Sequence, residues 1–345
     1  DTDEQRQRRE AAYQRWTTAA RDGNGRIAVD AIMMLPRDLR EREARRHLEE
    51  LPYLRTHLEM RLAYARGLGF RDAREALDEL LRHPEGERRA AAQATLLRTL
   101  RHNRAAMGDA LEHLAQRRFE QDPVRCAMLS TLSQLPLGCF DVTHLEALGE
   151  ALQHALDAAD LSTATAAAMQ NLVMRLFRVD SAWASGWLVK LLEVRGQIST
   201  YGLAAGLTAS DVEALAPVIE RLVARWCNKE RAGALLQLAG SLEARFARLP
   251  RLCEALETMA RELPFVGLAA EALRLLARHD RPRFRRLVPE LLAADQSYAL
   301  IAEVAGYVSW RRQDLLHELL ADRPTAGRFA TGRLHHVWDF GAGFH

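Results

Sequence analysis

Apolar residues recur along the chain with the period of an α-helix. In the stretch FRRLVPELL the apolar side chains fall on one stripe, at Phe284, Leu287, Val288, Leu291 and Leu292. This spacing places them on one side of a helix, because a helix turns once in about 3.6 residues. Residues 71–83 space alanine and leucine in the same way. We therefore expect a series of amphipathic helices, each burying one side.

Proline marks where these helices are expected to stop. Five prolines follow a leucine, at positions 36, 52, 136, 250 and 264. The residue before a proline is pushed out of the helical region, and proline itself suits the first turn of the next helix. Each Leu-Pro pair therefore predicts a helix boundary.

Three longer stretches share an order of features: 76–96, 110–132 and 215–238. Each has an amphipathic helix, a short polar break, an arginine and a second helix rich in small apolar residues. Arg89 and Arg125 are 36 residues apart in this order, and Arg231 follows 106 residues later. Recurring helix pairs are typical of repeat proteins, in which stacked neighbours bury the face that one pair cannot shield alone.

At its turns the chain resembles HEAT repeats, the helix-pair units of α-solenoids. The run DPVR at 122–125 matches the Asp-Pro turn and the Val-Arg start of the second helix in that pattern. Pro217 and Pro289 stand where the first helix of the family carries a proline. Residues 141–205 keep the helical rhythm but lack the turn signature. The resemblance implies an all-α fold, an α-solenoid of stacked antiparallel helix pairs.

Dividing the chain by the repeat length predicts its domain organisation. At roughly 37 residues per pair, the sequence holds about eight or nine pairs. Residues 1–25 are expected to form a capping helix with Tyr13 and Trp16 as inward anchors. Residues 26–322 are expected to form the solenoid. Residues 323–345, rich in glycine and aromatic side chains, are expected either to pack back on it or to dock onto another domain.

The charge balance restricts the partners that the chain is expected to bind. All but two of the 48 basic residues are arginine, but 46 acidic residues leave a net charge of +2. No global field therefore favours nucleic acid or an anionic membrane. No apolar stretch reaches the length of a membrane span, so no membrane partner is predicted.

The four cysteines indicate a cellular compartment but no metal site or redox activity. Cys126, Cys139, Cys227 and Cys253 are far apart and form no CxxC pair, so neither a zinc site nor a redox dithiol is predicted. Buried free thiols suit a reducing compartment, and we expect a cytoplasmic protein.

Arginine is concentrated around residues 278–292. The candidate binding residues here are Arg274, Arg278, Arg281, Arg283, Arg285 and Arg286. They are interpreted as the solvent side of a corner between helices, with an anion-binding patch as the alternative. Trp338 and Phe340, in the aromatic C-terminal segment, complete the set of candidate binding residues.

No catalytic or cofactor site is predicted. The triplet DFG at 339–341 lacks the other kinase motifs that would give it meaning. His335, His336, Asp339 and His345 are possible metal ligands, but no cysteine joins them and no metal is predicted. Trp183 and Trp187, four residues apart, are interpreted as core anchors rather than as a stacking surface.

The expected function is a protein–protein interaction scaffold or sensor module, alone or as part of a longer multidomain protein. Its partner would be another protein or other domains of the same polypeptide. This expectation follows from the resemblance, since fold by itself does not fix function. The alternative is nucleic-acid binding, because some DNA glycosylases that remove alkylated bases also resemble HEAT-repeat solenoids. An enzyme with a small-molecule substrate stays open as a third, less favoured hypothesis.

Overall fold

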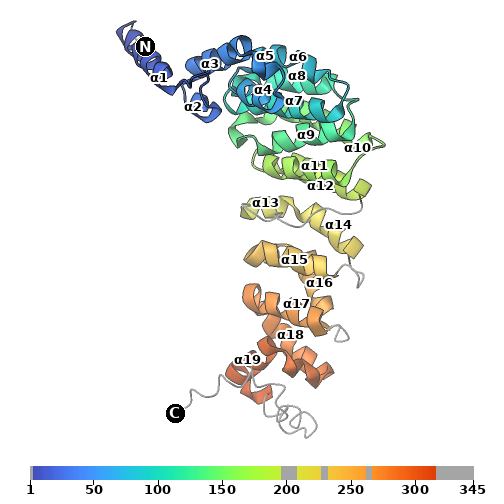
Figure 1. Ribbon diagram of the computed structural model, residues 1–345. Helices are drawn as coiled ribbons and strands as arrows, with labels where there is room; N and C mark the ends of the chain where they lie inside the picture. The colour runs from blue at the N-terminus through green and yellow to red at the C-terminus, as the bar shows by residue number, and fades with distance from the viewer. Residues whose placement is uncertain (1–2, 196–207, 227–231, 262–265, 316–345) are drawn as a thin grey trace. The chain divides into compact units, whose positions relative to one another are not determined.

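The computed structural model describes residues 3–195, 208–226, 232–261 and 266–315 (Figure 1). Every regular element within these ranges is a helix, and none of them is a strand. The predicted all-α class is therefore confirmed. None of the described helices combines the length and the apolar character that crossing a membrane requires.

The chain divides into two compact units, Asp1–Ala184 and Ser185–His345. The α-helices that begin in the first unit are α1 (Asp3–Ala20), α2 (Val29–Met33), α3 (Arg37–Glu50), α4 (Leu58–Ala65), α5 (Phe70–Ala76), α6 (Asp78–Leu81), α7 (Gly86–Arg98), α8 (Met107–Gln116), α9 (Asp122–Gln134), α10 (Leu145–Asp157), α11 (Thr163–Leu176) and α12 (Ser181–Arg195). Those of the second unit are α13 (Ala209–Ala214), α14 (Ala216–Trp226), α15 (Ala232–Leu242), α16 (Pro250–Arg261), α17 (Val266–His279), α18 (Arg281–Ala294) and α19 (Ala302–Arg311).

Two sets of helices pack within the first unit. Helix α9 lies between α7 and α11 and packs extensively on both, while α8 packs on α10 (Figure 1). The buried residues of α7 and α11 include small side chains, among them Ala92 and Ala168. Small side chains let neighbouring helices approach closely.

The turns before α7 and α9 are each held by an arginine. Arg89 Nη1 donates to the carbonyl of His83 in its own turn at 2.7 Å, and its Nε donates to Glu120 in the next turn at 3.0 Å. Arg125 in turn donates to the carbonyl of Glu120 and to the carboxylate of Asp160, one turn further on. The two arginines make equivalent contacts, each joining one inter-helix turn to the next.

Four of the five Leu-Pro boundaries are confirmed. Helices α2, α3 and α9 end just before prolines 36, 52 and 136, and α16 begins at Pro250. The fifth boundary, at residue 264, lies outside the described residues. The single helix predicted over 71–83 is instead two helices, α5 and α6, joined at Leu77, whose ψ angle is 2°. The carbonyl of Ala76 at this break accepts a hydrogen bond from Arg61.

In the second unit, α15 packs on α17 and α17 on α19, while α14 packs on α16. The apolar stripe predicted for α18 is confirmed, because all five of its residues, from Phe284 to Leu292, are buried. The side chain of Asp280 accepts from the backbone N–H of Arg283 and caps this helix. Pro289 lies inside α18.

A buried carboxylate joins α1 to α3. Glu43 is 1% exposed and accepts hydrogen bonds from the Tyr13 hydroxyl, from Arg21 Nη2 at 3.1 Å and from Arg46 Nε at 2.9 Å. Burial would raise the pKa of Glu43, but the hydrogen bonds from Tyr13 and Arg46 outweigh it and lower that pKa. Tyr13 is thus the inward anchor expected of the first helix, and Trp16 packs on the adjoining apolar cluster.

Candidate functional site

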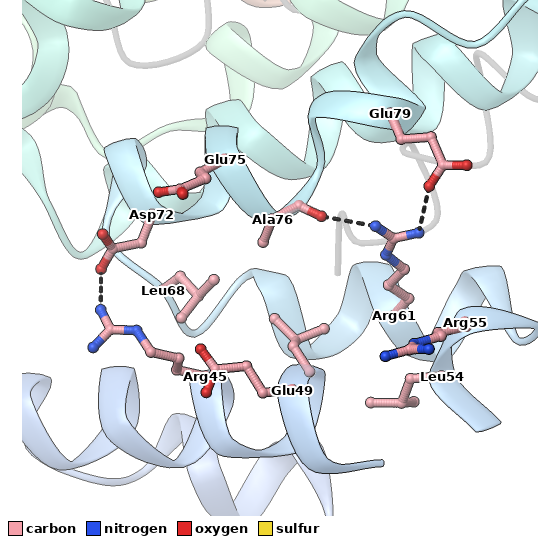
Figure 2. A pocket seen from close by; sticks show the side chains of 11 residues that line it. Arg45, Glu49, Leu54, Arg55, Arg61, Leu68, Asp72, Glu75, Ala76 and Glu79 are labelled. Atoms are coloured by element: carbon pink, nitrogen blue, oxygen red, sulfur yellow. Dashed lines mark hydrogen bonds and ion pairs between the residues drawn. The ribbon is translucent and has the colours of Figure 1, made fainter. Parts of the chain in front are cut away.

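A groove of about 570 Å³ opens in the first unit where α3, α4, α5 and α6 meet (Figure 2). Its lining comes from these helices, from the short 3-10 helix η1 (Pro52–Arg55) and from the connection after α4. The lining residues are Arg45, Leu48, Glu49, Leu54, Arg55, Arg61, Leu68, Asp72, Glu75, Ala76 and Glu79. The volume lies in the ordinary range of ligand pockets.

The groove has an apolar floor. Leu54 and Leu68 are 1% and 4% exposed, and Leu48 and Ala76 are half-buried. The Leu-Pro break after α3 turns the chain into η1, which places Leu54 beneath the groove. The local sequence thus sets the floor, since the proline ends α3 and the next leucine packs inward.

Two ion pairs stand at opposite ends of the groove. Arg45 Nη2 pairs with Asp72 Oδ2 at 2.5 Å, joining α3 to α5. Arg61 Nη1 lies 3.5 Å from Glu79 Oε2, and its Nη2 donates to the Ala76 carbonyl at 2.9 Å. Figure 2 shows both sets of contacts crossing from one helix to another. They link the helices on either side of the groove.

Three charged side chains on the rim have no ion-pair partner in the described part of the chain. They are Glu49 on α3, Arg55 on η1 and Glu75 on α5, and all three are exposed. The groove therefore offers free charges of both signs above an apolar floor. An apolar centre with a charged rim is the composition of many protein interfaces. It holds no side chain of the usual nucleophiles serine, threonine or cysteine, and no histidine.

The six candidate arginines between 274 and 286 differ in whether they form ion pairs. Arg274 donates to Glu303 on α19 and to Glu271 on its own helix. Arg283 and Arg286 both donate to Glu257 on α16. Burial would raise the pKa of Glu257, but hydrogen bonds, first from Arg283, lower it. These three arginines thus tie helices together.

The other three candidate arginines are exposed and have no ion pair among the described residues. They are Arg278 near the end of α17 and Arg281 and Arg285 on α18. Their solvent position agrees with the interpretation of this stretch as an exposed corner between helices. The remaining candidates, Trp338 and Phe340, lie outside the described residues.

One candidate tryptophan and two of the cysteines are buried. Trp187 is 6% exposed, with Lys190 Nζ 4.2 Å from its ring centre, as expected of a core anchor. Cys139 and Cys253 are buried free thiols, and burial raises the pKa of Cys253 to about 11. Within the described ranges, no group of three or more acidic, histidine or cysteine residues is arranged to hold a metal ion. The histidines considered as metal ligands, 335, 336 and 345, lie outside these ranges.

Sequence reasoning did not single out the groove. Its residues come from five short segments spread over 45–79, and only the fold brings them together. One local signal was present: Arg45 and Glu49 are four residues apart, on one side of α3.

A comparison with protein-family models, curated proteins and solved structures finds no match to this chain.

Proposed function

We propose that this chain is a protein–protein interaction scaffold built from HEAT-like helix pairs. In this proposal the groove between α3 and α6 binds a segment of another protein or of a further domain of the same polypeptide. The observation that carries it is the lining of the groove, in which unpaired charges of both signs surround an apolar floor. Protein interfaces combine these features, an apolar centre and a polar rim.

The helix order supports the repeat architecture. Helices α7, α9 and α11, which pack in succession, begin at residues 86, 122 and 163. In the second unit α15, α17 and α19 also pack in succession and begin at 232, 266 and 302. The equivalent contacts of Arg89 and Arg125 fit a repeating turn.

The groove predicts a defined class of peptide ligand. Peptides selected from a displayed random library on the intact protein should carry an apolar residue between charges. The substitutions Arg55→Glu and Glu75→Arg should each weaken those peptides about tenfold, because each reverses one unpaired rim charge, worth about 1.4 kcal/mol. Isothermal titration calorimetry measures both changes.

Arg285→Glu is the matched control for this experiment. Arg285 is also exposed and without an ion pair among the described residues, but it lies on α18 in the second unit. The control should leave the affinity of the selected peptides unchanged. Equal affinity for the wild type and for both groove variants would show that the peptides bind elsewhere, and the groove would lose its assigned role.

A further inference from the structure

Five exposed arginines in the first unit have no carboxylate partner within the described residues. They lie at or just beyond the carboxyl ends of helices: Arg66 after α4, Arg98 at the end of α7, Arg101 and Arg104 in the 3-10 helices η2 (Thr99–Arg101) and η3 (Arg104–Ala106), and Arg175 at the end of α11. We call this set the arginine edge. It contrasts with the many arginines elsewhere that form ion pairs, such as Arg45 and Arg125.

Direct contacts bring the ends of α7, α9 and α11 together. The short 3-10 helix η4 (Leu137–Cys139) follows α9, and Cys139 Sγ lies 3.6 Å from the carbonyl oxygen of Leu100, just after α7. Arg175 Nη2 donates to the carbonyl of Leu135, just after α9, at 2.6 Å. The arginines carried by these helix ends therefore share one part of the surface.

Arg104 lies directly against the η4 turn. Its Nη1 is only 2.8 Å from the position that a Cβ atom on Gly138 would occupy. A side chain at 138 would therefore displace the guanidinium, and glycine leaves room for it. Arg104 and Arg175 approach the same turn, one from η3 and the other from α11.

The local electrostatics show that these charges act on shared neighbours. Burial raises the pKa of Cys139, and the charges of Arg104, Arg101 and Arg175 oppose that rise. Burial lowers the pKa of Arg98, and the neighbouring charge of Arg66 lowers it further. No carboxylate contributes to either shift. Asp141, the acid nearest to η4 in sequence, accepts from the backbone N–H of Thr143 in its own turn.

A buried arginine adds to the positive potential behind this surface. Arg40 is 7% exposed, its Nε has no hydrogen-bond partner, and its Nη1 reaches the Leu35 carbonyl only at 3.4 Å. Burial lowers the pKa of His102, and the charges of Arg40 and Arg101 lower it further. The partial negative charge of a helix carboxyl end also favours a cation there, so arginines at these helix ends are stabilised even without a carboxylate partner.

We propose that the arginine edge binds the phosphate backbone of a nucleic-acid duplex. The guanidinium group matches phosphate with two parallel hydrogen bonds, and several unpaired arginines side by side match a row of phosphates. The one aromatic residue next to η4, Phe140, is buried, so it offers no surface on which the bases of a single strand could stack. A protein partner would need an apolar or aromatic anchor, which the arginine edge does not supply. The proposal concerns a different surface from the groove and does not depend on it.

The test is binding of a fluorescein-labelled 20-base-pair DNA duplex, followed by fluorescence anisotropy with the full chain. Three to five phosphate contacts predict that raising the salt from 50 to 200 mM weakens binding roughly 40- to 500-fold. The triple variant R98E/R101E/R104E should lose at least tenfold in affinity at 50 mM salt. Circular dichroism should show that its melting temperature is close to that of the wild type.

The control variant is R278E/R281E/R285E, which makes the same charge change at three exposed arginines of the second unit. It should keep affinity for the duplex within about threefold, because those residues lie outside the arginine edge. An equal loss in both variants would overturn the proposal, since binding would then follow net charge alone. Absence of duplex binding at 50 mM salt would also overturn it. So would stronger binding to poly-glutamate of equal charge, which would indicate an acidic protein segment as the ligand.

Discussion

Replacing Glu43 with alanine should lower the free energy of unfolding by about 2 kcal/mol. The substitution leaves the Tyr13 hydroxyl without its acceptor and removes the anion that Arg21 and Arg46 share. Leaving the buried Tyr13 hydroxyl without an acceptor costs about 1–3 kcal/mol. The two charges add little, because Arg21 is partly exposed and Arg46 keeps Glu50 as a partner. Urea unfolding followed by circular dichroism should show a transition at lower denaturant concentration.

Glu50→Ala is the control on the same helix. Glu50 pairs with the same arginine, Arg46, at 3.1 Å, but its side chain is 61% exposed. Exposed ion pairs contribute about 0–1 kcal/mol, so this variant should unfold almost as the wild type does. Similar losses for the two variants would show that the Glu43 carboxylate does not hold α1 against α3.

The fold class could be predicted because its signals are local. The stripe from Phe284 to Leu292 is a property of nine consecutive residues, and the helix ends at Leu35-Pro36 and Leu51-Pro52 follow from the geometry of proline. The break at Leu77 was missed. It involves a contact between Arg61 and the Ala76 carbonyl, and the sequence between them does not specify that contact.

The candidate sites were harder to predict, since they depend on contacts between distant residues. The arginines at 281–286 look alike in sequence. Arg283 and Arg286 nevertheless pair with Glu257, while Arg281 and Arg285 stay in solvent, because the pairing depends on how α16 packs beside α18. The arginine edge is assembled from residues 66 to 175, more than a hundred positions apart. No local pattern marks it, and only the packing of separate helix ends brings it together.

Mild acid should destabilise the first unit through a second buried group, His113. This side chain is 3% exposed, and its Nε2 donates to the side-chain amide oxygen Oε1 of Gln93, 2.8 Å away. Burial lowers the pKa of His113 from 6.5 to about 4, with a smaller contribution from the nearby charges of Arg117 and Arg74. The pKa of His47 is lowered in the same direction, again mainly by burial. Both imidazoles are therefore neutral in the folded protein at pH 7.

The sign of the pH effect follows from which state binds more protons. Below pH 6.5 the unfolded chain protonates His113, whereas the folded chain does so only near pH 4. Unfolding is therefore favoured as the pH falls, by about 2 kcal/mol between pH 7 and pH 5 and about 3 kcal/mol by pH 4. His47 adds to this loss. Urea unfolding at a series of pH values should show stability falling steadily below about pH 6.5.

The variant His113→Gln isolates the contribution of His113 to this pH dependence. Glutamine keeps a hydrogen-bond donor for Gln93 but does not titrate, so the loss of stability from pH 7 to pH 5 should shrink by about 2 kcal/mol relative to the wild type. The part due to His47 should persist, because its Nε2 still accepts from the backbone N–H of Ile27, 2.9 Å away. An unchanged pH dependence in His113→Gln would mean that His113 titrates normally in the folded protein. The hydrogen bond between His113 and Gln93 would then be open to water rather than buried between α7 and α8.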